Sequence, residues 1–505
     1  MPATAHTFTI DAAAARHVTV ELDVRPGLPA FMIVGLADAA VREARERIQA
    51  AIRNSGFEFP QRRITANLAP GDIPKAGAGL DLPIACAILA ATGQVPGEAL
   101  SRIALYGELS LDGRVRSARG TLAVAQAAKE LGLAAIALGA ARAREASLVR
   151  GLAVVVVGTL ARAADVLKGG RGDPLPRSLP AHRAAAARER IDLSDVRGRH
   201  DAVGALVLAA AGGHSLLLSG PPGTGKTMIA RRLPTILPPL THEEAIEVMR
   251  VRSLLGAPAE RLAQTRPFRA PHHSVTAAGL VGGASERQFG EAVLAHRGVL
   301  FLDELSEFSH AALESLRQPL EDGRVAIVRA RHASVHATRF MLLAATNPCA
   351  CGYAGEPRCS CSPAELARHR RRLSGPLIDR IDLSVSLRGG SSALAGGPVT
   401  SSAQAAARVR AARELQTRRF AREGIFVNGE MDARLLARHV RLDARASSML
   451  AGVRRSGLLS GRGEHRLLRV ARTAADLEGG GRVGAEHLGT ALALRPEQQS
   501  GKVAA

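Results

Sequence analysis

Strand-like and helical patterns alternate over the first third of the chain. Residues 17–24 and 30–35 have the composition of β-strands, whereas residues 38–54 repeat apolar positions at helical spacing. This alternation predicts a compact α/β domain over residues 1–167. Residues 168–190 then combine glycines, prolines and a basic alanine run, which is typical of a linker.

The middle of the chain has a different pattern. Continuous apolar runs, each ending in polar residues, occur at 215–219, 298–302 and 340–345. Such runs predict a parallel sheet over residues 191–388, with its chemistry at the C-terminal ends of the strands. Residues 389–404 are rich in Gly and Ser and predict a second linker, and residues 405–505 show almost only helical periodicity, which predicts a helical lid.

The first of these strands leads into a glycine-rich segment. Residues 219–227 read Ser-Gly-Pro-Pro-Gly-Thr-Gly-Lys-Thr, and a helical pattern follows them. In a P-loop the glycines let backbone N–H groups surround phosphate oxygens, the lysine reaches the β- and γ-phosphates, and the hydroxyl binds Mg²⁺. We therefore expect ATP and Mg²⁺ to bind at Gly220, Pro221, Pro222, Gly223, Thr224, Gly225, Lys226 and Thr227.

Polar residues follow the other two strands. Asp303 and Glu304 come directly after the run at 298–302, so Asp303 is expected to hold Mg²⁺ and Glu304 to polarise the attacking water. The alternative is a solvated acidic pair. Asn347 follows the run at 340–345 and could position the same water, although an Asn before Pro348 also suits a plain turn.

Three arginines are candidates for contacts with transition-state charge. Arg380 could reach the ATP of a neighbouring subunit as an arginine finger, and the alternative is a pair with Asp379 or Asp382 inside the domain. Arg462 and Arg466, in the last segment, are candidates for a second arginine sensor.

Four of the five cysteines lie close together in the sequence, at Cys349, Cys351, Cys359 and Cys361. Four thiolates would suit tetrahedral Zn²⁺, although the one-residue spacings are tighter than in most zinc knuckles. Free thiols or a redox pair are the alternatives.

The charge of the chain favours a polyanionic partner. Lys and Arg number 67 against 46 Asp and Glu, a formal net charge of +21, so nucleic acid is the first candidate. Residues 266–273 and a predicted hairpin over 321–332, turning at Asp322-Gly323, carry the candidate contacts: Arg266, Arg269, Arg329, Arg331 and His332. No apolar run reaches the roughly 18 residues of a membrane span and no leader is evident, so we expect a cytoplasmic protein.

Several specific motifs then suggest a family. The P-loop segment, Arg-Ala-Pro-His-His-Ser, Leu-Phe-Leu-Asp-Glu-Leu, Ala-Thr-Asn-Pro-Cys-Ala-Cys-Gly-Tyr and Ser-Gly-Pro-Leu-Ile-Asp-Arg-Ile-Asp-Leu together resemble the ComM/YifB family of magnesium-chelatase-like AAA+ proteins. The resemblance implies a hexameric ATPase that drives branch migration of DNA during natural transformation and works beside recombination proteins. It also implies an AAA+ parallel sheet with a C-terminal helical lid.

The N-terminal part resembles the Lon-protease (S5-like) fold, through residues 67–75 and 106–116. A Lon-type peptidase needs a Ser–Lys pair, but this chain has Ala78 at the serine position and no lysine over residues 122–125. We therefore expect a noncatalytic domain and no peptidase activity. The alternative for the whole chain is a motor that, like magnesium chelatase, remodels a protein partner.

Overall fold

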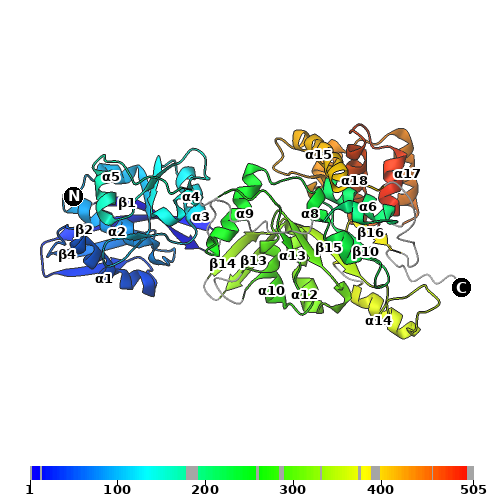
Figure 1. The fold of residues 1–505 in the computed structure, drawn as a ribbon, viewed down its shortest axis with the longest axis horizontal. Coiled ribbons are helices and arrows are strands. Elements are labelled where there is room, and N and C mark those ends of the chain that lie inside the picture. The colour runs from blue at the N-terminus through cyan, green and yellow to red at the C-terminus, as the bar shows by residue number, and fades with distance from the viewer. Residues whose placement is uncertain are drawn as a thin grey trace.

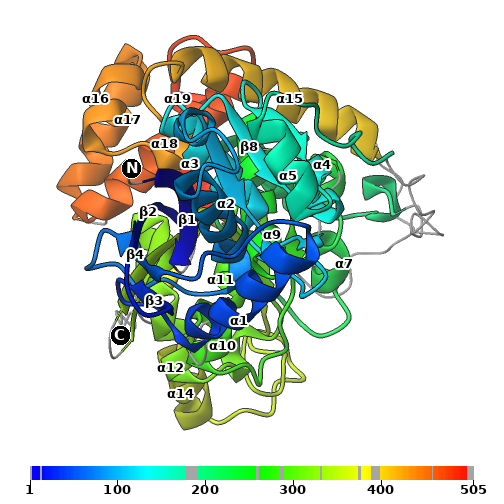
Figure 2. The ribbon, with the colours of Figure 1, turned by 90° about the vertical axis from the view of Figure 1, so that its left-hand side faces the viewer.

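The computed structural model describes residues 3–11, 14–177, 191–257, 261–283, 289–329, 332–373, 377–387, 399–457 and 459–496. The molecule is elongated (Figure 1), with the N-terminal domain at one end and the predicted ATPase core in the middle. The C-terminal helices lie along one side of the core, as the end-on view also shows (Figure 2).

The N-terminal domain is built on a seven-stranded mixed sheet with the order β3-β4-β2-β1-β5-β8-β9. Strands β1 and β2 form a long antiparallel pair, and β5, β8 and β9 continue the sheet in parallel. The strands are β1 (Ala3–Asp11), β2 (Ala14–Arg25), β3 (Ala30–Val34), β4 (Arg63–Ala69), β5 (Ile103–Tyr106), β8 (Ala135–Leu138) and β9 (Ala153–Val156), with a separate small ladder of β6 (Glu108–Leu109) and β7 (Val115–Arg116).

Helices cover both faces of this sheet because its strands alternate their side chains between two cores. Leu105 packs on the side of α1 (Ala39–Asn54), α2 (Asp81–Ala91) and α5 (Leu160–Leu167). Its neighbours Ala104 and Tyr106 pack on the side of α3 (Thr121–Glu130) and α4 (Ala143–Ala146). The predicted linker begins as packed chain, since Asp173 accepts a hydrogen bond from the Gly158 amide at 2.7 Å.

The core sheet has five parallel strands in the order β11-β12-β15-β10-β16. They are β10 (Leu216–Ser219), β11 (Phe268–Arg269), β12 (Val299–Leu302), β15 (Met341–Thr346) and β16 (Leu383–Ser386). Leu216 and Leu218 face α6 (His200–Gly212) and the C-terminal helices, whereas Leu217 faces the opposite core. Strand β15 lies between β10 and β12, so the chain segments that follow these three strands emerge side by side.

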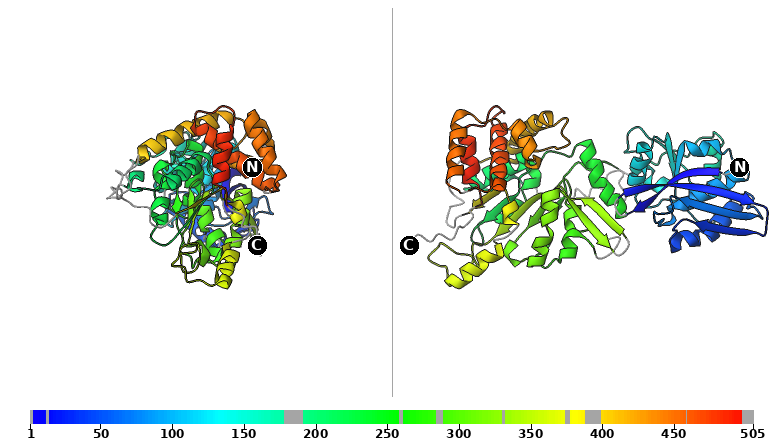
Figure 3. Two further views of the ribbon diagram at one scale, coloured as in Figure 1. Left: turned by 90° about the vertical axis from the view of Figure 1, so that its right-hand side faces the viewer. Right: turned by 180° about the vertical axis from the view of Figure 1, so that it is seen from behind.

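The remaining helices of the core flank the sheet and its loops. They are α7 (Lys226–Ala230), α8 (Leu233–Ile236), α9 (His242–Leu254), α10 (Ala277–Val281), α11 (Glu291–Leu294), α12 (His310–Ser315), α13 (Arg317–Asp322) and α14 (Pro363–Leu373). Helix α14 projects from the core at the end remote from the N-terminal domain (Figure 3).

The predicted hairpin exists, but its turn was placed wrongly. Strands β13 (Arg324–Arg329) and β14 (His332–Ala337) pair from Arg324–Ala337 to Arg329–His332. Asp322 instead ends α13, and Gly323 caps that helix at a φ of 62°. Asp-Gly suits a helix end as well as a hairpin turn because glycine adopts positive φ without strain.

The C-terminal segment is helical, as predicted. It comprises α15 (Ser402–Arg419), α16 (Ala433–His439), α17 (Ala444–Arg455), α18 (Gly461–Leu477) and α19 (Ala485–Ala493). The expected boundary at residue 405 falls inside α15, which begins at Ser402. Buried Asn428 donates to Asp476 at 2.8 Å, and Arg419 pairs with the same carboxylate at 2.5 Å, which ties α15 to α18.

Helix α9 joins the N-terminal domain to the core. Its residues Ile246 and Met249 are buried in the same cluster as Phe8 and Tyr106 of the N-terminal sheet. On the N-terminal side, the Arg142 guanidinium donates to the Gly256 carbonyl at 2.6 Å. The two parts therefore share a hydrophobic core through α9, which stands at their junction in Figure 1.

Within the described ranges, no helix combines the length and the apolar character that crossing a bilayer requires.

Candidate nucleotide site

The P-loop follows β10 as an open turn with two glycines in left-handed conformations. Gly223 and Gly225 have φ of 76° and 87°, which side chains other than glycine adopt only with strain. A β-carbon at Gly220 would lie 2.5 Å from the Leu387 carbonyl oxygen, so this position also requires glycine. Thr224 fixes the turn, since its hydroxyl donates to the Pro221 carbonyl at 2.8 Å.

Lys226 reaches across the loop to the neighbouring strand end. Its ammonium donates to the carbonyls of Gly220 and Pro221 at 2.6 and 2.9 Å and to Oδ1 of Asn347 at 3.0 Å. Burial lowers the pKa of Lys226, and the carboxylates of Asp303 and Glu304 oppose that shift. The structure thus brings the lysine, the acidic pair and Asn347 to one edge of the sheet.

A hydroxyl and a carboxylate form the second part of the site. Oγ1 of Thr227 donates to Oδ2 of Asp303 at 2.7 Å. Hard oxygen ligands of this kind suit Mg²⁺. Among the described residues other than its chain neighbours, none has a heavy atom within 4 Å of where a β-carbon at Gly223 would stand. The residues present therefore fit a magnesium–nucleotide ligand, with Thr227 and Asp303 as its metal-binding pair.

Glu304 is held in an unusual backbone conformation. Its φ of 52° and ψ of 50° lie in the left-handed region, which costs a non-glycine residue about 1–3 kcal/mol. Its amide donates to the Asp303 carboxylate at 3.0 Å. The Glu304 side chain is 59% exposed, and Oε2 lies 3.4 Å from Nδ1 of His273. The strained turn therefore points this carboxylate outward beside a histidine.

Asn347 is positioned by a second histidine. Its carbonyl oxygen lies 3.0 Å from Nε2 of His369 on α14, while its side chain accepts from Lys226. His369 is buried. The residue predicted as a polar sensor therefore links the P-loop lysine to α14.

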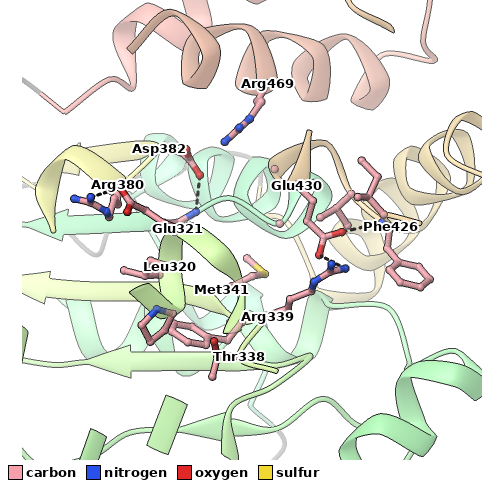
Figure 4. A pocket seen from close by; sticks show the side chains of 18 of the residues that line it. Leu320, Glu321, Thr338, Arg339, Met341, Arg380, Asp382, Phe426, Glu430 and Arg469 are labelled. Carbon is pink, nitrogen blue, oxygen red and sulfur yellow. Dashed lines mark hydrogen bonds and ion pairs between the residues drawn. The ribbon is translucent and has the colours of Figure 1, made fainter. Parts of the chain in front are cut away.

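The predicted arginine contacts lie at the opposite, amino-terminal edge of the sheet. Here a cavity of about 630 Å³ is lined by residues that precede the strands, among them Ser215, Gly298 and Asp382. Arg380 forms an ion pair with Glu321 (Figure 4), a partner inside the same domain that the sequence did not indicate.

Arg462 and Arg466 line the same cavity. Arg462 is 77% exposed and lies 3.5 Å from Glu321, and Arg466 donates to the Ile381 carbonyl at 3.0 Å. Both therefore lie at the edge remote from the P-loop of their own chain. Burial lowers the pKa of Arg466, while Asp382 and Asp379 oppose the shift.

The predicted nucleic-acid contacts lie in different surroundings. Arg266 is mostly covered, with a side chain 11% exposed, and it pairs with Glu244 at 2.8 Å, so it is poorly placed to reach a phosphate. Arg269 is 42% exposed and pairs with Glu291 at 2.6 Å. Arg329 and His332 are adjacent at the ends of β13 and β14, whereas Arg331 lies outside the described residues.

The cysteine cluster also forms in space. The sulfurs of Cys349, Cys351, Cys359 and Cys361 all lie within 4.8 Å of one another. The cluster directly follows Asn347 and precedes α14. In the N-terminal domain, Ala78, which occupies the position of a Lon-type serine in the resemblance, begins a short 3₁₀ turn.

Two contacts of the site were missed by sequence reasoning. The sequence indicated no role for His272 and His273, which lie between the P-loop and the acidic strand. The structure puts His273 beside Glu304 and lets His272 bond Ser274 at 2.9 Å. His369 carried no signal, since 22 residues separate it from Asn347.

Three family profiles match the chain in order. The profile described as "Subunit ChlI of Mg-chelatase" matches residues 20–141. "Magnesium chelatase, subunit ChlI" matches residues 192–393, which contain the site, and "Magnesium chelatase, subunit ChlI C-terminal" matches residues 399–495.

Relatives match over nearly the whole length. An uncharacterised protein of Mycobacterium tuberculosis is 42% identical over 492 residues, 95% of each chain. YifB of Escherichia coli is 39% identical over 482 residues, and competence protein ComM of Haemophilus influenzae is 39% identical over 484 residues, in each case 95% of this chain and 94% of the relative. The matches confirm the resemblance seen in the motifs: the chain belongs to the ComM/YifB family of magnesium-chelatase-like AAA+ proteins.

Proposed function

We propose that the protein is an ATPase that assembles into a ring and couples ATP hydrolysis to the remodelling of DNA. One observation carries the ATPase part of the proposal. Lys226, the Thr227–Asp303 pair, Glu304 and Asn347 converge at the ends of three adjacent parallel strands. Positioning and electrostatic stabilisation account for nearly all of phosphoryl-transfer catalysis, and this edge supplies both.

Each residue has a separate role in the proposed reaction. The P-loop amides and Lys226 bind the phosphates, and Thr227 and Asp303 hold Mg²⁺, which when bound offsets phosphate charge. Glu304 orients a water and accepts its proton. Its carboxylate is 59% exposed, so a water can reach it. Asn347 already contacts Lys226 and therefore faces the same space as the water to be positioned.

The position of Arg380 supports assembly into a ring. Arg380, Arg462 and Arg466 lie at the amino-terminal edge of the sheet, whereas the P-loop lies at the carboxyl edge. An arginine finger at this edge serves the nucleotide of a neighbouring copy and not its own. In the proposed ring, a hexamer as in related motors, Arg380 exchanges Glu321 for the phosphates of that neighbour.

Charge and kinship support DNA as the substrate. The net charge of +21 favours a polyanion. One relative is named a competence protein, and we accordingly propose branch migration, a helicase-like activity, during natural transformation. Half-exposed Arg269 offers a candidate phosphate contact. Arg329 and His332, which are paired in register at the ends of β13 and β14, are further candidates by their position in the backbone.

Remodelling of a protein partner is the second candidate. All three family profiles carry the description of a magnesium-chelatase subunit. A motor of this kind shares the ATPase edge but needs no nucleic acid.

Steady-state ATP hydrolysis by the purified full-length protein distinguishes the candidates. It is measured without DNA and with forked, single-stranded and duplex DNA at two salt concentrations. We expect stimulation by DNA that weakens as salt rises, because phosphate contacts release counterions. Hydrolysis indifferent to every DNA would instead support the protein remodeller.

The control is Glu304→Gln, which keeps the size of the side chain and removes the base. Loss of a positioned base lowers turnover by about 10²–10⁴-fold, while ATP binding persists. Turnover like that of the wild type in this variant would remove Glu304 from the mechanism and leave the origin of the ATPase signal open to a contaminant.

A further inference from the structure

The four clustered cysteines have the geometry of a single metal ion's ligands. Four sulfurs at about 2.3 Å from a tetrahedral Zn²⁺ lie about 3.8 Å apart. The Sγ atoms of Cys349 and Cys359 lie 3.9 Å apart, those of Cys351 and Cys359 3.6 Å, and those of Cys349 and Cys351 3.3 Å. All five cysteines, which lie within the described ranges, are free of disulfides. These separations fit a tetrahedron with room for one ion.

Backbone amides are arranged to stabilise the thiolates. The Cys351 amide donates to Sγ of Cys361 at 3.4 Å, and the Ala354 amide donates to Sγ of Cys349 at 3.2 Å. Such N–H···S bonds fix the orientation of the cysteine side chains. At metal sites, hydrogen bonds to the ligands have the same effect. The bond from Cys351 to Cys361 links the first cysteine pair to the second, within a loop that has neither helix nor strand between β15 and α14.

The ligand chemistry selects the metal. Four soft thiolates without a carboxylate or imidazole favour Zn²⁺ over hard ions such as Mg²⁺. Four protein ligands also close the coordination sphere, which is the mark of a structural site and leaves no position for substrate.

The cluster contacts the nucleotide site on two sides. Cys349 is separated from Asn347 only by Pro348, and a β-carbon on Gly352 would lie 2.6 Å from Cδ of Pro222 in the P-loop. Helix α14 starts shortly after Cys361 and returns His369 to the Asn347 carbonyl at 3.0 Å. The cysteine loop therefore packs against the P-loop and is connected to α14, and Asn347 lies at its start.

We propose that Cys349, Cys351, Cys359 and Cys361 bind one Zn²⁺ that fixes the loop after Asn347 against the P-loop. The zinc is a structural ion with a positioning effect. It holds Asn347 in contact with Lys226 without touching the nucleotide. The metal part of the proposal stands whether or not the motor acts on DNA.

The first test is the metal content of the purified protein, measured by mass spectrometry without any assay of activity. We expect one zinc per chain, released by a mercurial reagent as thiols are consumed. Cys359→Ser and Cys361→Ser are expected to lose zinc, whereas Cys86→Ala, which removes a cysteine buried in α2, retains it. Metal-free protein purified from zinc-supplemented cells, or iron in place of zinc, would overturn the assignment.

The second test addresses positioning. Zinc is removed from the wild-type protein by the mercurial reagent, the reagent is reversed with dithiothreitol, and zinc is then added back. Misplacement of a positioning group by about 1 Å costs about 10²-fold in rate, so we expect turnover to fall by that order while the affinity for a fluorescent ATP analogue changes little. Readdition of zinc restores turnover. Equal loss of binding and turnover, or turnover unchanged without zinc, would refute the positioning effect.

Discussion

Both edges of the core sheet carry charged groups, but the two edges use them in opposite ways. At the carboxyl edge the Glu304 carboxylate is 59% exposed, and its turn is strained. At the amino-terminal edge the Glu244 carboxylate is 5% exposed and is matched to Arg266. The comparison teaches that charged groups mark a reactive site where they are exposed to solvent, and that they stabilise the fold where they are buried and paired.

Arg380 belongs to neither category, because it lies at the amino-terminal edge yet is proposed to act in catalysis. Arg380→Ala is expected to lower turnover by about 10³-fold and to leave nucleotide binding intact, as for an arginine finger. Turnover and the binding of a fluorescent ATP analogue measure the two effects. Arg317→Ala, which removes an exposed ion pair with Glu314, is the control and should change neither.

Mixing variants sharpens this test. Arg380→Ala and Glu304→Gln are each expected to turn over slowly alone. In the proposed ring, a mixture of the two contains interfaces with an intact Arg380 facing an intact Glu304. Recovery of turnover on mixing is therefore expected. If rings that contain both variants do not recover turnover, Arg380 stabilises the fold and does not act in a site shared between subunits.

The stabilising role of the amino-terminal edge can be tested at Arg266. Arg266→Ala leaves the buried Glu244 carboxylate unpaired, which costs about 3–5 kcal/mol. A large fall in the apparent melting temperature is the expected result. Arg269→Ala is the matched comparison, since its half-exposed pair is worth about 0–1 kcal/mol. DNA affinity should respond in the reverse order, weakening for Arg269→Ala; equal melting temperatures would contradict the distinction between the two arginines.

His273 tests how the carboxyl edge orients its base. His273→Ala is expected to lower kcat by roughly tenfold, or about 1.4 kcal/mol of transition-state stabilisation, because Glu304 loses its neighbour. The KM for ATP should remain the same. His272→Ala removes the adjacent ring, which bonds Ser274, and serves as the control. If His273→Ala has the same kcat as His272→Ala, His273 does not position Glu304.

The smallest effect concerns acid stability at the amino-terminal edge. Burial by itself would raise the pKa of Glu247, but hydrogen bonds from His296 and Arg297 outweigh burial and lower that pKa to about 2 from 4.5. A lowered pKa gives stability that is complete above pH 4.5 and is lost as the pH falls toward 2. Glu247→Gln should flatten the dependence of the melting temperature on pH in this window. A slope unchanged by the substitution would assign the acid response to other groups.

Sequence reasoning succeeded where the signal was local and failed where it depended on distant partners. The runs that became β10, β12 and β15 were visible because strands buried on both faces must be continuously apolar. The residues that follow them, such as Lys226 and Asp303, came together because parallel strands end at one edge. Arg266 and Glu244 are 22 residues apart, and Arg380 and Glu321 are 59 apart. No periodicity marks such pairs.

The misplaced hairpin turn has a different origin. Gly323 has a φ of 62°, and a glycine with positive φ suits both a hairpin turn and the end of a helix. The pairing of Arg324 with Ala337 shows that the strand starts directly after the glycine. A turn signal thus gives the backbone conformation of one residue and not the direction in which the chain continues.

Helix α9 limits how this protein can be recombined with its relatives. Ile246 and Met249 complete the core of the N-terminal domain, while Glu244 and Glu247 of the same helix anchor arginines of the ATPase part. A fragment that starts at residue 191 would expose Ile246 and Met249 of α9 to solvent. A chimera joined between the domains would pack α9 of one protein against the N-terminal domain of another, and these two surfaces did not evolve together. Exchange of the N-terminal domain between family members should therefore include the outward face of α9 as part of the exchanged module.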